Sequence, residues 1–328
     1  MGISYEFHAD ATQPGLERLW REATDWGEAT LDTLRRWFEV APFGKPRIVV
    51  ATDDETGEMV GQFRFMPSRV CVNGEVVRAV RPFGTIVTPA MRDAVKSNNP
   101  LQQPAVAMYF RAVDELKAVG EQFIYMVPDP RWMRLFQMLP FLQTGTFPLW
   151  SLPLPLAKPY PLGEEGYTFG SLEKWDERVD RLWEKSSRLH GCTVLRDAET
   201  LKWKLANGNY ETTAIERDGE LVGLVASRRK GDRQWLVCDV LAADGREAMR
   251  ATLAAACNVG HEKSLTAGEG QEAILKVAVL ATPLMETVVR DLGFRRDAYD
   301  FPLVVHVLDE NVPAENVAPA RWYVSAND

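Results

Sequence analysis

The sequence predicts an α+β fold of two tandem domains, each with a mixed, mainly antiparallel sheet flanked by helices. Three observations support this prediction. The chain has 328 residues, which is long for one hydrophobic core and comfortable for two domains of about 150 residues each. One order of elements, helix–hairpin–strand–helix–strand–helix–strand, occurs twice along it. A proline-rich segment, 151–166, separates the two occurrences, so we expect domains at 1–150 and 167–328.

The first half begins with helical periodicity over 14–40, where leucine and tryptophan recur at three- and four-residue spacing. Two hairpins follow. The first joins strands at 47–52 and 58–66, and the second turns at Asn73-Gly74, a pair that tolerates the positive φ of this turn type. The remaining elements are strands at 68–72, 75–80 and 83–88, a helix at 104–119, a strand at 123–127, a helix at 131–139 and a strand at 141–150.

Residues 151–166 contain four prolines and two glycines, which disfavour both a helix and a central strand and therefore predict a linker. The second half then repeats the order of the first, although the halves share few identical residues. Its predicted elements are helices at 172–190 and 198–205, a hairpin of 211–217 and 220–229, a strand at 235–242, a helix at 245–260, a strand at 272–280, a helix at 283–292 and a strand at 302–308.

The composition excludes several classes of function. A formal net charge of −8 argues against a nucleic-acid partner, because phosphate neutralisation needs concentrated lysine and arginine. The cysteines, Cys71, Cys192, Cys238 and Cys257, lack the paired spacing of a zinc site, so no metal is expected. The N-terminus has no leader pattern, and no apolar run approaches the roughly 18 residues of a membrane helix. We therefore expect a cytoplasmic protein without a membrane span.

Short motifs in both halves resemble those of one known family. In the first half they are 57–61 (GEMVG), 85–92 (TIVTPAMR), and a block from 127–129 (VPD) to 139–141 (LPF) with Gly145 after it. In the second half they are 196–210 (RDAETLKWKLANGNY), 218–223 (DGELVG), 239–241 (DVL) and 291–294 (DLGF). None is specific alone, but their order, occurring twice over most of the chain, resembles the GCN5-related N-acetyltransferase (GNAT) superfamily.

The resemblance implies that an acyl donor, acetyl-CoA or another acyl-CoA, binds as substrate in a wedge between two parallel strands that splay apart. The strands here would be 85–89 and 123–127. Main-chain groups of Thr85, Ile86 and Val87 would bind the pantetheine arm and polarise the thioester. The pyrophosphate would lie at the N-terminus of the next helix. Arg92 and Asp129 match the motifs of the family at the same site.

The phosphate loop departs from the family pattern R-x-x-G-x-G/A, because no glycine lies between Arg92 and Gly120. Asparagine can adopt the left-handed geometry that glycine would supply. The candidate phosphate-binding residues are therefore Asn98, Asn99, Leu101 and Gln102. An ordinary capped helix start explains the same residues equally well. In the second half, Asp244 would repel a pyrophosphate, so the first half is the preferred donor site.

The catalytic residues are less well indicated. Many members of the family use a tyrosine to protonate the leaving thiolate, but Phe136 and Val289 stand at that position in the two halves. Tyr125 and Tyr109 remain as candidate acids, with water or a loss of activity as alternatives, and both also suit a core. Asp239, an acid within an apolar strand, is the candidate base; it alternatively accepts hydrogen bonds in the core.

The leading hypothesis is an N-acyltransferase, most simply an acetyltransferase, that acts on a small-molecule or peptide amine. One alternative is a catalytically inactive tandem protein that binds or scaffolds a partner, which the missing tyrosines and glycine loops favour. Another is a long-chain acyltransferase that uses acyl carrier protein. The acidic charge and the lack of a long helical insertion disfavour the aminoacyl-transferring branch. The acceptor and the oligomeric state, a homodimer among the options, stay open.

Overall fold

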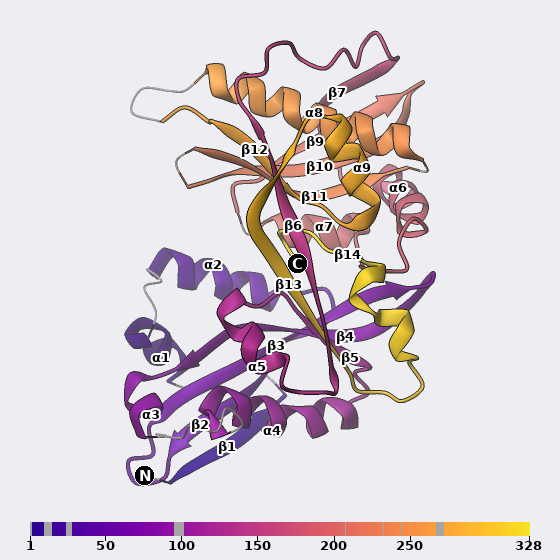
Figure 1. Cartoon of the computed structure of the whole chain (residues 1–328). Helices are drawn as coiled ribbons and strands as arrows, with labels where there is room; N and C mark the ends of the chain where they lie inside the picture. Colours follow the sequence, from indigo (N-terminus) through magenta and orange to yellow (C-terminus); the bar gives the residue numbers. More distant parts are fainter. Residues whose placement is uncertain are drawn as a thin grey trace.

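The computed structural model contains two α+β halves joined by one continuous sheet (Figure 1). The sheet is mixed and mainly antiparallel, and helices flank it, which confirms the predicted fold class. Of the predicted donor residues, Asn98, Asn99 and Leu101 lie outside the residues that the structure describes, as does Asp244. The described residues are 2–9, 15–23, 28–94, 102–206, 208–231, 233–243, 245–266 and 272–328.

The N-terminal half contains one run of neighbouring strands with helices on both faces. Helix α4 buries its apolar side against β2 and β3, while α1 and α2 pack on the opposite face around Met66 and Ile86. Its strands are β1 (Ile3–His8), β2 (Arg47–Asp53), β3 (Met59–Val72), β4 (Glu75–Val87), β5 (Phe123–Met126) and β6 (Leu142–Pro153). Its helices are α1 (Leu16–Ala23), α2 (Glu28–Glu39), α3 (Pro89–Ala94), α4 (Pro104–Ala118), the 3₁₀ turn η2 (Pro130–Trp132) and α5 (Met133–Phe136).

Strands β3 and β4 are longer than the sequence predicted, because each continues through a proline. Pro67 pairs with Val80 in register, and Pro82 pairs with Phe65. Both prolines lie beyond the last paired residue of the neighbouring strand on the other side, β2 or β5. The missing N–H therefore costs no ladder hydrogen bond, which is the condition under which a strand tolerates proline.

The C-terminal half repeats this arrangement around a larger core, in which the long helix α8 contacts β9 to β12. Its strands are β7 (Tyr167–Ser171), β8 (Cys192–Val194), β9 (Glu211–Arg217), β10 (Glu220–Lys230), β11 (Gln234–Ala242), β12 (Lys276–Leu280), β13 (Arg295–Val307) and β14 (Trp322–Tyr323). Its helices are α6 (Glu177–Ser187), α7 (Ala198–Ala206), α8 (Arg246–Leu265), α9 (Pro283–Asp291) and the 3₁₀ turns η3 (Ala314–Val317) and η4 (Pro319–Arg321).

The two halves exchange their long strands β6 and β13, which run side by side through the middle of the molecule (Figure 1). The strand order is β1-β2-β3-β4-β5-β13-β6-β12-β11-β10-β9-β7. Strand β13 therefore lies between β5 and β6 of the first half, and β6 lies between β13 and β12. Strand β6 also extends to Pro153, into the predicted linker 151–166. The division at 1–150 and 167–328 stays a prediction, and strands cross it in both directions.

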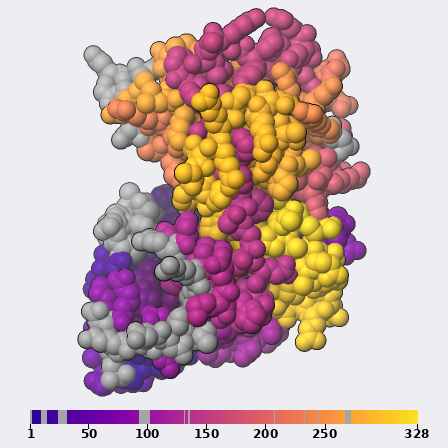
Figure 2. Space-filling model, viewed as in Figure 1, coloured from indigo at the N-terminus to yellow at the C-terminus, as the bar shows by residue number. Residues whose placement is uncertain are grey.

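The last residues of the chain return to the junction of the halves. Strand β14 pairs with β8, and β8 in turn pairs with the end of β3. Figure 2 shows the yellow C-terminal residues packed against the magenta residues of the N-terminal half. Trp322 is buried there between Phe123 and Tyr125. This return places residues 324–328 beside the sites described below.

Candidate functional site

Strands β4 and β5 separate in the N-terminal half. They pair in parallel only where Ala79 and Val80 meet Phe123 and Ile124, and β4 then runs on to Val87 without a β5 partner. The opening lies where the sequence predicted a wedge. Main-chain groups that are freed in this way can bind an extended ligand, as at the edge of a sheet.

A cavity of about 400 Å³ fills this opening, and we call it the wedge cavity. Gly84 and Thr85 of β4 form one wall, Val127 and Asp129 after β5 form another, and Trp132 lies at its side. Most of the remaining surface is apolar. Two predicted donor residues, Thr85 and Asp129, thus lie in one cavity.

The other predicted donor residues lie apart from this cavity. Ile86 is buried against α1 and α2, and Val87 pairs with Gly61 of β3. Arg92 is an exposed residue of α3, and Gln102 is exposed just before α4. None of these four side chains lines the wedge cavity as described. Ile86 and Val87 directly follow Thr85, which does line the cavity, on β4.

Helix α4 directs its N-terminus toward the wedge cavity. Pro104 occupies its first turn, and the next two residues, Ala105 and Val106, line the cavity. No side chain caps this helix end in the described residues. Pro104 has no N–H, and the N–H groups of Val106 and Ala107 donate to the main-chain oxygen of Gln103. The dipole of this 15-residue helix still favours a negative charge nearby. The position suits the phosphates of an extended ligand.

Tyr109 of α4 lines the wedge cavity, and its hydroxyl lies 2.7 Å from Nδ1 of His306. His306 comes from β13, so the strand exchange supplies it to the first half. Burial raises the pKa of Tyr109 well above its usual value. Burial, assisted by the charge of Lys117, lowers the pKa of His306 to about 4. At neutral pH the pair is therefore an uncharged phenol beside an uncharged imidazole.

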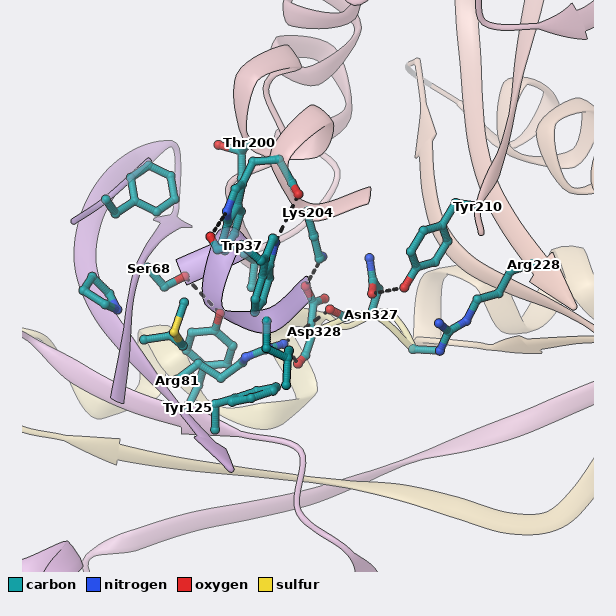
Figure 3. Close-up of a pocket in the computed structure, with 18 residues that line it drawn as sticks. Trp37, Ser68, Arg81, Tyr125, Thr200, Lys204, Tyr210, Arg228, Asn327 and Asp328 are labelled. Atoms are coloured by element: carbon teal, nitrogen blue, oxygen red, sulfur yellow. Dashed lines mark hydrogen bonds and ion pairs between the residues drawn. The ribbon is translucent and has the colours of Figure 1, made fainter. Parts of the chain in front are cut away.

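A second cavity, of about 310 Å³, lies between the two halves, and we call it the junction cavity (Figure 3). Trp37 of α2 and Trp203 of α7 stack in its wall, with ring centroids 4.5 Å apart. Each indole Nε1 donates a hydrogen bond to the main-chain oxygen of the other tryptophan, at 3.1 and 2.9 Å. These reciprocal contacts fix the two halves against each other at the cavity.

The two cavities are adjacent. Arg81, Phe83 and Asp328 line both of them. A ligand in the wedge cavity and another in the junction cavity would therefore meet at these residues. Two substrates that must react need such a shared boundary.

Tyr125 faces the junction cavity, not the wedge cavity. Its hydroxyl lies 2.9 Å from Oγ of Ser68, and the two hydroxyls share a hydrogen bond. Burial is the main cause that raises the pKa of Tyr125 to about 12. The two predicted acids therefore lie on different sides of the boundary.

Asp239 belongs to a buried group of four charges behind the junction cavity. Its carboxylate accepts hydrogen bonds from Nε of Arg196 at 2.7 Å and from Nζ of Lys204 at 2.9 Å. The same two cations bind the carboxylate of Asp328, Lys204 at 2.6 Å. Burial opposes the ionised form of Asp328, but the charges of Arg196 and Lys204 outweigh it and lower its pKa. Two cations and two anions balance, which is the arrangement that makes buried charge tolerable.

The corresponding opening in the C-terminal half is occupied by the protein itself. Strands β11 and β12 pair from Gln234 to Val237, and β11 continues beyond. The N–H of Val240 in that continuation donates to the hydroxyl of Tyr323 at 2.9 Å. This main-chain donor is thus already bound within the protein.

The described residues add two observations about partners. They contain no group of three or more His, Cys, Asp or Glu side chains that could hold a metal ion. None of the helices in the described ranges is long and apolar enough to cross a membrane. The cysteines are free and buried.

The fold is similar to solved acyltransferase structures. A GCN5-related N-acetyltransferase from Anabaena variabilis matches 93% of this chain and 73% of its own, with a TM-score of 0.64 and 12% identity. A tandem GNAT protein from the clavulanic acid biosynthesis pathway matches 94% of this chain and 99% of its own, with a TM-score of 0.56 and 13% identity. N-myristoyltransferase from Saccharomyces cerevisiae, solved with bound myristoyl-CoA, matches 93% and 79%, with a TM-score of 0.55 and 11% identity.

At this identity the similarity establishes the GNAT fold alone. The sequence matches no protein-family model and no curated protein sequence. The fold nevertheless confirms the resemblance that the short motifs indicated.

Several site residues had no signal in the sequence. His306 and Asp328 reach the site only through the strand exchange and the returning C-terminal residues. Arg196 and Lys204 lie in the segment that resembles a family motif, but pairing with Asp239 across 35 or more residues is not visible in any spacing. Arg81 lies in a long strand beside a proline, and its place at both cavities depends on where β5 ends.

Proposed function

We propose that this protein with a GNAT fold is an N-acyltransferase that binds an acyl-CoA in the wedge cavity and an amine acceptor in the junction cavity. The main observation behind this proposal is the separation of β4 from β5 next to the N-terminus of α4. A splayed strand pair offers N–H and C=O groups to a pantetheine arm and a thioester. The helix end offers a position for the phosphates.

In this proposal the amine nitrogen attacks the thioester carbonyl carbon at the shared boundary of the two cavities. A C–N bond forms, the C–S bond breaks, the amine proton passes to water, and the leaving thiolate takes a proton from a protein group. We assign that group to Tyr109, because its side chain lines the wedge cavity and its hydroxyl lies 2.7 Å from Nδ1 of His306. Tyr125, on the acceptor side, is assigned a positioning role with Ser68.

Asp239 is assigned a supporting role in the same scheme. Both of its carboxylate oxygens bind cations, so it holds Lys204 and, through it, Asp328 at the wall of the junction cavity. The apolar lining of the wedge cavity also suits acyl chains longer than acetyl. A long-chain donor, carried by CoA or by acyl carrier protein, is therefore an alternative, and the test includes long-chain acyl-CoA.

Calorimetry with acetyl-CoA, octanoyl-CoA and myristoyl-CoA tests the donor site. The substitution Val106→Trp puts a large side chain into the wedge cavity and should weaken acyl-CoA binding at least about tenfold, or roughly 1.4 kcal/mol. The control is Val119→Trp, the same change at an exposed position at the end of the same helix, which should bind as the wild type does.

Two results would contradict the proposal. Equal binding by Val106→Trp and the wild type would remove the wedge cavity as the donor site. The absence of binding to any of the three thioesters by the wild type would favour the non-catalytic tandem protein instead.

A further inference from the structure

The junction cavity carries an excess of positive charge. Its ionisable walls include Arg81, Lys204, Arg228 and Asp328. Lys204 and Asp328 belong to the buried group of four charges, which is balanced. Neither Arg81 nor Arg228 forms an ion pair with a side-chain carboxylate in the described part of the chain. Arg81 does donate to the main-chain oxygens of Asn327 and Asp328. Arg228 is therefore the guanidinium that brings uncompensated charge to the cavity wall.

Two hydrogen-bond donors at the same end of the cavity also lack a partner. Nε of Arg228 is buried and has no acceptor among the described residues, although its guanidinium lies over the ring of Tyr210 at 5.0 Å. Tyr210 donates its hydroxyl proton to Oδ1 of Asn327 at 2.8 Å, which orients that amide. Nδ2 of Asn327 is then buried without an acceptor in the described structure. Figure 3 shows Tyr210 and Arg228 facing Asn327.

Buried donors without acceptors are costly, since each forfeits its hydration without a replacement. A ligand oxygen that accepts from both would remove the cost. Because one donor is a guanidinium, the matching acceptor is an anion, and a carboxylate fits its planar geometry. Asp328 does not supply it, because Arg196 and Lys204 already bind its side-chain oxygens.

The other end of the junction cavity is apolar and aromatic. Trp37, Trp203 and Phe43 line it together with Leu34 and Met66. Rigid aromatic walls of this kind bind the apolar body of a small ligand. The boundary with the wedge cavity, at Arg81 and Phe83, lies on the β4 side. A ligand that spans both ends therefore passes the place where a donor thioester would be.

We propose that the junction cavity binds an amine that also carries a carboxylate and an apolar side chain, the chemistry of a hydrophobic amino acid. The carboxylate binds Arg228 and Asn327, the side chain lies among the tryptophans, and the amine faces the wedge cavity. The role of this ligand as acyl acceptor rests on the proposed function. Its binding to the cavity does not.

Calorimetry with three matched probes tests the carboxylate site: L-phenylalanine, 3-phenylpropanoate, which lacks the amine, and phenethylamine, which lacks the carboxylate. The two carboxylates should bind at least about tenfold more tightly than phenethylamine, as expected for a charge-assisted hydrogen bond. The substitution Arg228→Gln should remove this preference. It should leave acetyl-CoA binding unchanged, because Arg228 does not line the wedge cavity.

The control is Arg229→Gln, the same loss of charge one residue along β10, where the side chain contacts the main-chain oxygen of Glu272 on the protein surface. It should retain the preference for carboxylates. Thermal unfolding of both variants checks that they fold. Binding of the carboxylates no tighter than that of phenethylamine, or an unchanged preference in a folded Arg228→Gln protein, would overturn the proposal.

The two proposals fail separately in this experiment. If acetyl-CoA binds and the carboxylates show no preference, the acyltransferase proposal stands and the acceptor class is wrong. If the carboxylates bind through Arg228 and no thioester binds, the cavity is a carboxylate site in a protein without donor binding.

Discussion

Tyr109 lines the wedge cavity, and its hydroxyl contacts a histidine from the other half of the chain. Its 2.7 Å contact with Nδ1 of His306 fixes the direction of the phenol, and burial keeps the proton on it at neutral pH. A phenol in the wall of the donor cavity can give its proton to a thiolate that forms beside it. The residue therefore carries the catalytic part of the proposal.

The substitution Tyr109→Phe should lower kcat by about 10²-fold or more, with little change in the Kd of acyl-CoA. The measurement is release of free thiol from the acyl-CoA that binds most tightly, with a panel of amines as acceptors. Tyr125→Phe is the matched comparison, because it removes a buried hydroxyl on the acceptor side of the boundary. A larger loss of kcat in Tyr125→Phe than in Tyr109→Phe would reverse the two assignments.

His306 makes stability depend on pH. Its pKa is about 4 in the folded protein, because burial and then the charge of Lys117 disfavour the imidazolium. An unfolded histidine titrates near pH 6.5. Between these values the unfolded chain binds a proton that the folded chain does not. The free energy of unfolding should therefore fall as the pH is lowered from about 6.5 to about 4, by at most on the order of 2–3 kcal/mol.

Urea unfolding of wild type and His306→Gln at pH 7 and pH 4.5 measures this contribution. Glutamine can keep an acceptor near Tyr109 but does not titrate, so the variant should lose less stability on acidification. His190, whose pKa burial lowers to about 3, contributes in the same direction and remains in both proteins. The same loss in both proteins would show that His306 does not contribute.

At the scale of elements, the separation of β4 and β5 follows from how each strand is bordered. Strand β5 ends at Met126, and on its other side β13 pairs from Val304 to Val307. Strand β4 follows β3 instead, through Pro82 and up to Val87. The two strands are thus held by different neighbours, and the right-handed twist of the sheet carries them apart. The wedge cavity is a result of the pairing on either side.

Strand β6 approaches another element closely at Gly145. A Cβ atom at this position would lie 2.4 Å from Cβ of Pro319 in η4, so alanine requires η4 to move. We expect Gly145→Ala to lower the free energy of unfolding by about 1–3 kcal/mol, as overpacking does. Gly163→Ala, in the segment between the halves, meets nothing within 4 Å and should change it by less than about 0.5 kcal/mol. Urea unfolding distinguishes them, and equal stability of the two variants would contradict the packing argument.

At the scale of the whole molecule, the buried charges connect segments that lie far apart in the chain. Lys204 of α7 binds Asp239 of β11 and Asp328. The substitution Lys204→Met leaves two buried carboxylates with one cation, Arg196, and should cost about 3–5 kcal/mol in the free energy of unfolding. Lys202→Met, an exposed lysine of the same helix, should cost less than about 0.5 kcal/mol. Chemical denaturation measures both, and a small cost at Lys204 would contradict the role of the charge balance.

The sequence predicted most elements and the fold class because their signals are local. The turns at Asn73-Gly74 and Asp218-Gly219 have the positive φ values that their residues indicated. The sequence missed β1, although Ile3, Tyr5 and Phe7 alternate. It could not predict the strand exchange, since the same alternation suits pairing within a half or across halves. Asp328, His306 and Arg228 reach their positions through that long-range pairing. Of the residues that the sequence indicated, Thr85, Tyr109, Tyr125 and Asp129 line the cavities, and their roles stay predictions.

The exchange of β6 and β13 has a consequence for how such a chain could arise. A single half on its own would have a long last strand with no strand to pair with. Its sheet would also end at an unpaired strand, β5 in the first half or β12 in the second. Two separate copies would relieve both defects by trading strands with each other, as domain-swapped dimers do. Residues 154–166 make that encounter intramolecular, which raises the effective concentration of each partner for the other. In its strand pairing the chain thus resembles a swapped dimer whose subunits cannot dissociate.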